Sequence, residues 1–450
     1  MSNQITSFET VHIEYFGTDG IRQKAEKFTP NFLAKIIKGL VDYKGDNVKV
    51  FLAGDTREST EWILSDLESA LETFGVEYSN AGVLPTPAIN FCFFEMGFGF
   101  AIDVTASHNP YTDNGIKIFE RGNTHGKKLS EKGRKIIESS LSSEQSFDLI
   151  PPTIRENLHE EALEIYKDHL LKYIGKVDFT RLHLGMDCAN GATSTLNKSI
   201  FETLGAKVEL INSNQNYNTE INKDCGSTHL KQLQDLVKTK NLDFGIAFDG
   251  DGDRCILVDK NGNIVDGDEI IAILTNYLKL PSAVVTVMAN QGIMNWAKEN
   301  NINLEITSVG DQNVANTMIS QSIELGGEQS GHIILPGEPT GDGMLTALMI
   351  TKVVSETKKP LHNLASIITK YPQIIVNVPA TPEQKSLLKT SDKIKKLLLD
   401  YDKKLQSVSG RLLVRPSGTE PLIRITMWGN DEKEIANLAN ELKNKLGENL

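Results

Sequence analysis

The chain has 450 residues, more than one hydrophobic core ordinarily serves, so several domains are expected. Hydrophobic residues make up 39% of it and charged residues 24%, which is typical of a folded water-soluble protein and excludes a disordered or membrane-embedded one. The net charge of −12 disfavours nucleic acid and anionic membranes as partners, so any site for an anionic ligand has to be built locally.

Neither a signal peptide nor a membrane-spanning segment is expected from the sequence. Residues 1–16 lack both a basic start and an apolar run. The most apolar candidate, residues 91–104, is too short for a bilayer and predicts the end of a buried helix followed by a strand. The cysteines are too widely spaced for a zinc site or a disulfide framework, which favours a cytoplasmic protein; they are Cys92, Cys188, Cys225 and Cys255.

A unit of strand, polar turn and helix recurs three times along the chain. Strands are expected at residues 48–53, 182–186 and 283–288. A helix follows each of them: the first covers residues 58–74, the second ends near residue 204 and the third ends near residue 299. This alternation predicts three related α/β domains with largely parallel sheets.

The remaining segments predict a linker and a smaller last domain. The polar stretch 139–152 is expected to be a linker, and residues 371–379 begin a different pattern. There a Lys- and Leu-rich helix, strands at 410–414 and 422–428 and a closing amphipathic helix predict a small α+β domain. We therefore expect domains over residues 1–152, 153–262, 263–372 and 373–450.

The first loop with chemical potential is Thr105-Ala-Ser-His-Asn-Pro110, which follows the expected strand 100–104. Reactive groups in open α/β sheets usually lie where a parallel strand ends, and Ser107 stands there on an accessible loop. Such a serine can carry a phosphoryl group covalently, and Lys117 is near enough in the chain to move a proton or neutralise charge. A polar turn closed by Asn-Pro is the alternative.

The second loop, Asp249-Gly-Asp-Gly-Asp-Arg254, follows the apolar run 244–248. Crowded carboxylates at a strand end are costly unless they bind a hard cation, and magnesium suits them. A calcium-binding helix-loop-helix is excluded because Arg254 and Lys260 stand where that loop needs Gly and Glu. A solvated acidic turn is the remaining alternative.

The third loop is Gly326-Gly-Glu-Gln-Ser-Gly-His332, before the expected strand 333–335. Its glycines allow Glu328 and Ser330 to face the same side, where a carboxylate can accept hydrogen bonds from sugar hydroxyls. A glycine-rich turn without a ligand explains the same residues.

The fourth loop, Arg415-Pro-Ser-Gly-Thr-Glu-Pro421, joins two strands of the last domain. Arg415, the hydroxyls of Ser417 and Thr419, and the N–H groups around Gly418 form a donor set that suits a phosphate. A tight hairpin would need only the Pro and Gly, so the Arg and the hydroxyls favour the phosphate site.

With these four loops in this order, the chain resembles the α-D-phosphohexomutases over nearly its whole length. Within that superfamily it is most similar to the bacterial phosphoglucosamine mutase branch. The similar segments are Phe16-Gly-Thr-Asp-Gly-Ile-Arg22, Cys225-Gly-Ser-Thr-His229, the Gln of Gly-Glu-Gln-Ser-Gly, and Thr340-Gly-Asp-Gly343.

The resemblance implies a four-domain architecture around a central cleft, with three α/β domains of mixed sheets and a smaller C-terminal α+β domain. It implies that Ser107 is the phosphoserine and that one magnesium ion per chain binds Asp249, Asp251, Asp253 and a phosphoserine oxygen. The other implied residues line the transfer centre (Arg22, His108, Lys117, Arg254), hold the sugar (Glu328, Ser330, His332) or grip the non-reacting phosphate (Arg415, Ser417, Gly418, Thr419).

The activity implied is interconversion of glucosamine 6-phosphate and glucosamine 1-phosphate, which feeds amino-sugar nucleotide and cell-wall precursor synthesis. A hexose 1,6-bisphosphate is the implied intermediate and activator, and the chain is expected to be a monomer or a homodimer. Mutases of mannose or glucose phosphates, a metal-dependent phosphatase and a non-catalytic sugar-phosphate-binding homologue are the alternatives. Gln23, Ser308 and Gln312 depart from the branch's usual pattern, which leaves the exact hexose open.

Overall fold

The computed structural model describes residues 15–17, 19–45, 48–153, 157–417 and 421–450. The contacts of the chain divide it into two compact units, residues 1–262 with 339–348 and residues 263–338 with 349–450. Each unit holds two of the four sheets that position the candidate site residues. No helix among the described residues is long and apolar enough to span a membrane.

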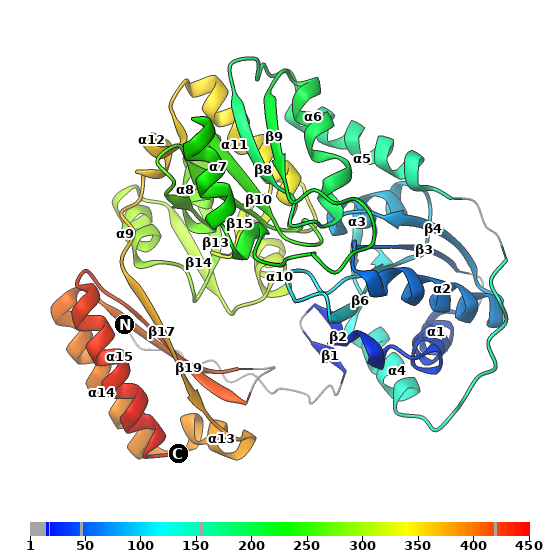
Figure 1. Ribbon diagram of the computed structural model, residues 1–450. Helices are drawn as coiled ribbons and strands as arrows, with labels where there is room; N and C mark the ends of the chain where they lie inside the picture. The colour runs from blue at the N-terminus through cyan, green and yellow to red at the C-terminus, as the bar shows by residue number, and fades with distance from the viewer. Residues whose placement is uncertain (1–14, 18, 46–47, 154–156, 418–420) are drawn as a thin grey trace. The chain divides into compact units, whose positions relative to one another are not determined.

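The first sheet is mixed, with strand order β1-β2-β6-β5-β3-β4 and β7 beside β6. Strands β5, β3 and β4 are parallel, whereas β6 runs antiparallel to β5. Helices α1, α2 and α4 pack together beside this sheet (Figure 1). The strands are β1 Phe16–Gly17, β2 Gly20–Lys24, β3 Lys49–Gly54, β4 Glu77–Val83, β5 Phe100–Val104, β6 Asp113–Arg121 and β7 Gly126–Lys128, and the helices are α1 Pro30–Lys44, α2 Glu58–Thr73, α3 Thr86–Glu95 and α4 Glu131–Leu141.

The second sheet, in the same unit, has the neighbouring strands β11-β10-β8-β9, of which β10, β8 and β9 are parallel. The acidic loop lies between the antiparallel strands β10 and β11, both fully buried. The elements here are α5 His159–Ile174, β8 His183–Asp187, α6 Asn197–Thr203, β9 Lys207–Ile211, α7 Lys231–Lys240, β10 Phe244–Phe248 and β11 Cys255–Asp259.

The other unit begins with β12 and contains a third sheet of order β14-β13-β15-β16, parallel except for its last pair. Its elements are β12 Ile264–Val265, α8 Gly267–Leu278, β13 Ser282–Thr286, α9 Gln291–Glu299, β14 Asn303–Thr307, α10 Asp311–Gln321, β15 Gly326–Gly327, β16 Ile333–Ile334, α11 Gly343–Thr357, whose first residues belong to the other unit, and α12 Leu361–Ala365.

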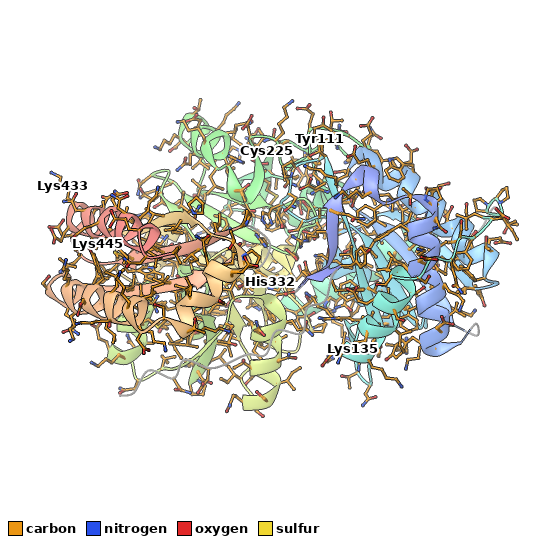
Figure 2. The ribbon with its side chains drawn as sticks, turned by 90° about the horizontal axis from the view of Figure 1, so that it is seen from below. Tyr111, Lys135, Cys225, His332, Lys433 and Lys445 are labelled. Carbon is orange, nitrogen blue, oxygen red and sulfur yellow. The ribbon has the colours of Figure 1, made fainter. Side chains whose placement is uncertain are left out.

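The fourth sheet is antiparallel, of order β17-β19-β18, and α14 and α15 pack against it. Lys433 and Lys445 project from the exposed face of α15 (Figure 2). The elements are β17 Gln373–Pro379, α13 Pro382–Thr390, α14 Asp392–Leu405, β18 Arg411–Pro416, β19 Leu422–Trp428 and α15 Glu432–Gly447. The expected fold class, three α/β domains with mixed sheets and a smaller C-terminal domain, is confirmed.

Several expected elements differ in detail. The helix expected to run to residue 204 is a 3₁₀ turn, Ala192–Thr195, followed by the short α6. The single Lys- and Leu-rich helix is two helices, because the hydroxyl of Ser391 caps the start of α14 by accepting a hydrogen bond from Ile394 N. The linker expected from residue 139 starts later, since α4 continues to Leu141.

All four cysteines are free and buried. Their thiols lie in the interior of the fold, at Cys92, Cys188, Cys225 and Cys255.

Candidate active site

Ser107 follows β5 and lies against the acidic loop of the second sheet. Its Oγ donates a hydrogen bond of 2.7 Å to Asp249 Oδ2, between residues 142 positions apart in the chain. Nδ1 of His108 lies 3.2 Å from the same Oγ. The structure therefore brings together the first two loops that the sequence singled out.

The backbone of Ser107 adopts a left-handed conformation, with φ of 52°. This conformation is uncommon for a residue other than glycine and costs about 1 kcal/mol or more unless the surroundings hold it. The side chain is only 1% exposed. The expectation of an accessible loop serine is therefore wrong in this conformation, because the acidic loop covers the hydroxyl.

The three aspartates of the acidic loop form a compact set of oxygen ligands. One carboxylate oxygen each from Asp249, Asp251 and Asp253 lies within 4.8 Å of the others, and all three residues are buried. Burial and the charges of Asp251 and Asp253 raise the pKa of Asp249 well above its usual value. Oδ1 of Asp251 is buried without a hydrogen-bond partner among the described residues. Buried carboxylates with a spare acceptor fit magnesium, which takes oxygen ligands.

Lys117 brings a positive charge against two of these carboxylates. It lies on β6, and its Nζ is 2.7 Å from Asp251 Oδ2 and 3.3 Å from Asp253 Oδ2. Burial opposes its charge, but Asp19 and Asp251 prevail and raise the pKa of Lys117. The ammonium is therefore held charged beside the serine loop.

Arg22, Arg254 and His108 complete this part of the site. Nε of Arg254 lies 3.8 Å from both Asp249 Oδ2 and Asp253 Oδ1. Burial, together with the charges of Arg254 and Arg22, lowers the pKa of His108 to about 3, so its imidazole is neutral at neutral pH.

Asp19 is a site residue that the sequence reasoning did not assign. Its carboxylate lies 2.6 Å from Arg22 Nη2 and 3.1 Å from Lys117 Nζ. It also forms an ion pair of 2.5 Å with Lys128. Asp19 belongs to the segment 16–22 that carried the resemblance, so the motif contained the signal, but two of its partners, Lys117 and Lys128, come from strands remote in sequence.

The third loop lies in the other unit, between β15 and β16. Glu328 Oε1 accepts a hydrogen bond of 3.0 Å from Gly310 N, at the start of α10. His332 is buried, with Nε2 3.9 Å from Asp311 Oδ2, whereas Ser330 is exposed. Ser308 and Gln312 flank the same turn and are half-buried.

The fourth loop begins at the end of β18. Arg415 is opposite Arg424 of β19, and burial together with that second cation lowers the pKa of Arg415. Glu328 acts on Arg415 in the opposite direction, which shows that the third and fourth loops approach each other in this unit. Ser417 is buried, while Gly418 and Thr419 lie outside the described residues.

The sequence matches four domain descriptions of one family in succession. "Phosphoglucomutase/phosphomannomutase, alpha/beta/alpha domain I" covers residues 14–147, domain II covers 164–262, domain III covers 266–371, and the C-terminal domain covers 375–445.

Curated relatives match over nearly their full length. A phosphoglucosamine mutase of Caldicellulosiruptor bescii is 41% identical over 93% of this chain and 96% of its own. One of Clostridioides difficile is 40% identical over 97% of this chain and 99% of its own.

Solved structures share the fold at lower identity. The phosphoglucomutase parafusin of Paramecium has a TM-score of 0.73 at 19% identity, covering 95% of this chain and 94% of its own. The Aspergillus fumigatus N-acetylphosphoglucosamine mutase, solved with GlcNAc-6P and magnesium, has a TM-score of 0.64 at 16% identity, covering 98% and 97%.

Proposed function

The chain belongs to the phosphoglucomutase/phosphomannomutase family and is a phosphohexomutase, and from this premise we propose that it interconverts glucosamine 6-phosphate and glucosamine 1-phosphate through a phosphorylated Ser107. The single observation that carries the mechanism is the contact of 2.7 Å between Ser107 Oγ and Asp249. It joins a serine to a carboxylate cluster that suits magnesium. The choice of glucosamine rests on the relatives at 40% and 41% identity that are named phosphoglucosamine mutases.

The transfer runs in two balanced halves. In the first, the bond between phosphorus and Ser107 Oγ breaks as phosphorus bonds to the C1 oxygen of glucosamine 6-phosphate. The C1 hydroxyl releases its proton, and Oγ takes one up. The bisphosphate then reverses its orientation, so that its C6 phosphate faces Ser107. In the second half, phosphorus leaves the C6 oxygen for Ser107 Oγ; Oγ releases its proton, and the C6 oxygen takes one up.

The residues around Ser107 supply charge and handle this proton. We assign the proton transfer to Lys117, whose ammonium would give a proton to Ser107 Oγ as the phosphoryl group leaves and would then regain one from the sugar hydroxyl. The neutral His108 beside Oγ is the second group in reach. Arg22 and Arg254 add positive charge at the moving phosphoryl group. Magnesium, held by Asp249, Asp251, Asp253 and a phosphoserine oxygen, would offset the negative charge of that group.

We assign the sugar and its non-reacting phosphate to the loops of the other unit. Glu328, Ser330 and His332 would hold hydroxyls, and Arg415 with Ser417 would hold the phosphate, together with Gly418 and Thr419. The electrostatic interaction between Glu328 and Arg415 supports a shared site for the sugar hydroxyls and the non-reacting phosphate within this unit.

Two measurements test this function. A coupled assay compares formation of glucosamine 1-phosphate with mutase activity on glucose and mannose phosphates, and a preference for either of the latter overturns the choice of substrate. Intact mass with peptide mapping should show a fraction of the purified protein one phosphoryl group heavier, with the added mass on Ser107. Release of inorganic phosphate without isomerisation would instead indicate a phosphatase.

A further inference from the structure

We propose that Arg57 and Asn222 are positioning residues for phosphoryl transfer, which hold the backbone of the Ser107 loop from two domains and thereby aim Oγ at Asp249. This inference rests on the proposed role of Ser107 as the phosphoryl carrier. Neither side chain contacts Oγ; both contact carbonyl oxygens of the loop, so they act through Ser107.

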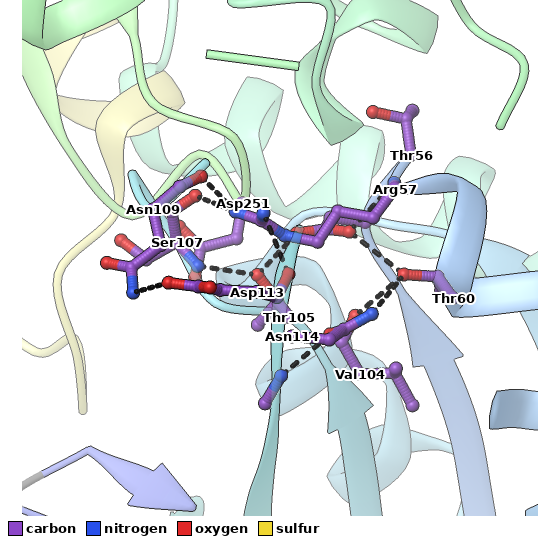
Figure 3. Close-up of polar contacts among 12 residues, drawn as sticks. Thr56, Arg57, Thr60, Val104, Thr105, Ser107, Asn109, Asp113, Asn114 and Asp251 are labelled. Atoms are coloured by element: carbon purple, nitrogen blue, oxygen red, sulfur yellow. Dashed lines mark hydrogen bonds and ion pairs between the residues drawn. The ribbon is translucent and has the colours of Figure 1, made fainter. Parts of the chain in front are cut away.

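Arg57 directs its guanidinium at the loop from inside the first domain. The side chain is fully buried. Nη2 donates to the carbonyl oxygens of Ser107 and Asn109, at 2.7 and 2.8 Å. Nη1 donates to those of Pro110 and Asp113, at 2.6 and 3.1 Å. Figure 3 shows Arg57 beside Ser107, Asn109 and Asp113. One planar fork therefore fixes four carbonyl groups, which the single ammonium of a lysine cannot do.

Asp55 orients this guanidinium and links it to the strand end before Ser107. Its Oδ2 accepts a hydrogen bond of 2.9 Å from Arg57 Nε and another of 2.7 Å from the hydroxyl of Thr105. The Thr105 hydroxyl oxygen in turn accepts a hydrogen bond of 2.9 Å from Ser107 N. The ion pair is buried on both sides, so each charge is compensated where water is excluded.

Asn222 reaches the same carbonyl groups from the second domain. Its Nδ2 lies 2.8 Å from the Ser107 oxygen and 3.2 Å from the Asn109 oxygen. A Cβ at Gly250 would lie 2.7 Å from the Ser107 oxygen and 2.8 Å from Asn222 Nδ2, so the acidic loop needs glycine there.

The segment that carries Asn222 also binds the backbone on both sides of Arg57. Asn218 N donates a hydrogen bond of 2.7 Å to Thr56 O, and Glu58 N donates one of 3.0 Å to Asn218 O. The second domain therefore grips the Ser107 loop both directly, through Asn222, and indirectly, through the segment of Arg57.

This arrangement explains how Ser107, whose backbone is left-handed, keeps its side chain pointing in one direction through a reaction that changes the charge on Oγ. Phosphorylation adds nearly two negative charges at Oγ and replaces a short hydrogen bond with a bulky group. Contacts confined to the carbonyl side are unaffected by that change. Transfer needs the reacting atoms aligned, and a misplacement of about 1 Å can cost roughly a hundredfold in rate.

The test uses two variants of Asn222, which has a left-handed backbone. Asn222→Asp keeps the shape of the side chain and tolerates this backbone, but it removes both N–H donors of the amide. Asn222→Gly removes the same donors without adding a charge. Asn241→Asp and Asn241→Gly are matched controls, since Asn241 is also left-handed, at φ of 50°, but caps α7 at the surface. Arg57→Lys is paired with Arg121→Lys, whose guanidinium also binds two carbonyl groups, those of Phe94 and Phe98, remote from Ser107.

The readout is the rate at which glucose 1,6-bisphosphate phosphorylates dephosphorylated protein at Ser107, followed by intact mass, beside KM, kcat and the unfolding midpoint. We expect transfer to slow by about 10- to 100-fold in both Asn222 variants, with KM changed less than about twofold and the controls equal to wild type. If Arg57→Lys does not fold, the Asn222 pair decides alone.

Undiminished transfer in the Asn222 variants overturns the positioning role, as does a loss that merely follows a lowered unfolding midpoint. A wild-type chain that takes up no phosphoryl group at Ser107 overturns the proposed function, and the positioning role with it. Normal uptake by wild type together with normal uptake by the Asn222 variants overturns the positioning role alone.

Discussion

At the scale of single residues, the geometry around Ser107 separates what is needed for chemistry from what is needed for folding. Its hydroxyl makes one buried hydrogen bond to Asp249, worth about 1 kcal/mol to stability. The left-handed backbone is held by its carbonyl contacts, which a change of side chain leaves in place.

Ser107→Ala should therefore abolish sustained mutase turnover and leave the protein folded. The expected change in the unfolding midpoint is a few degrees at most, because only the contacts of the hydroxyl with Asp249 and His108 are lost. Mutase assays and thermal unfolding check this, with Ser140→Ala as a control, since that serine donates to Lys35 O within the first domain. Near-normal turnover in the Ser107 variant would refute its role as phosphoryl carrier.

Arg415 should matter more for binding than for transfer, since the phosphate assigned to it does not react. Arg415→Ala should raise KM by roughly ten- to a hundredfold, because a charge-assisted contact is worth about 1.5 to 3 kcal/mol. Arg415→Lys should be impaired too, because an ammonium cannot make two parallel hydrogen bonds to one phosphate. Some loss of kcat is expected as alignment suffers.

Steady-state kinetics and the phosphoserine fraction decide the place of Arg415. Phosphorylation of Ser107 should persist in both variants. An unchanged KM with kcat alone abolished would put Arg415 at the chemical centre, contrary to the assignment.

Residue patterns predicted the chemical groups of the site but not their surroundings. Ser107 and the aspartates stand in short motifs, so the sequence alone indicated them. Arg57 and Asn222 carry no local signal, because their partners are carbonyl groups 50 to 115 positions away. The burial of Ser107 also depends on the approach of a second domain, which no pattern within residues 105–110 encodes.

At the scale of elements, the start of α8 holds an unusual concentration of acid. Asp266 and Glu269 form a capping box. Asp268 is buried, and its carboxyl group accepts a hydrogen bond of 2.7 Å from Asn290 N. Burial and the charge of Asp266 raise the pKa of Asp268 to about 8. The cations that act on this group are Lys370 and Arg411.

This carboxyl group should make stability fall as the pH rises. The folded chain holds the proton up to about pH 8, whereas the unfolded chain releases it near pH 4. Between those values the folded state binds more protons, so each step up in pH removes stability. Asp268→Asn stays neutral and can still accept from Asn290 N.

From pH 5 to 8, the unfolding midpoint of wild type should therefore change less favourably with rising pH than that of Asp268→Asn. Thermal unfolding of both proteins in the same buffer series measures the difference. Parallel curves would show that Asp268 is ionised in the folded protein at neutral pH.

Element prediction succeeded where the pattern was long and failed where a single residue decides. Strands β10 and β19 have the limits that their apolar runs indicate, Phe244–Phe248 and Leu422–Trp428. The break between α13 and α14 depends on one serine, whose capping hydrogen bond interrupts an otherwise continuous helical pattern.

At the scale of the whole molecule, the carboxylate cluster lies in a loop and the apolar cores lie elsewhere. Chelation of magnesium should therefore stop turnover without unfolding the protein. Mutase assays and far-ultraviolet circular dichroism before and after EDTA test this, and added magnesium should restore activity. A large loss of helical signal on chelation would show that the ion has a structural role.

The buried thiols have a practical consequence. Burial raises the pKa of Cys92, Cys188 and Cys225 to about 12 and that of Cys255 as well. Since the thiolate is the reactive form, maleimide dyes should leave all four unmodified at neutral pH. A single introduced cysteine, such as Lys433→Cys on the exposed face of α15, would then carry a fluorophore selectively. No native cysteine then has to be removed before labelling, and fluorescence anisotropy during turnover would test whether the C-terminal domain changes its mobility.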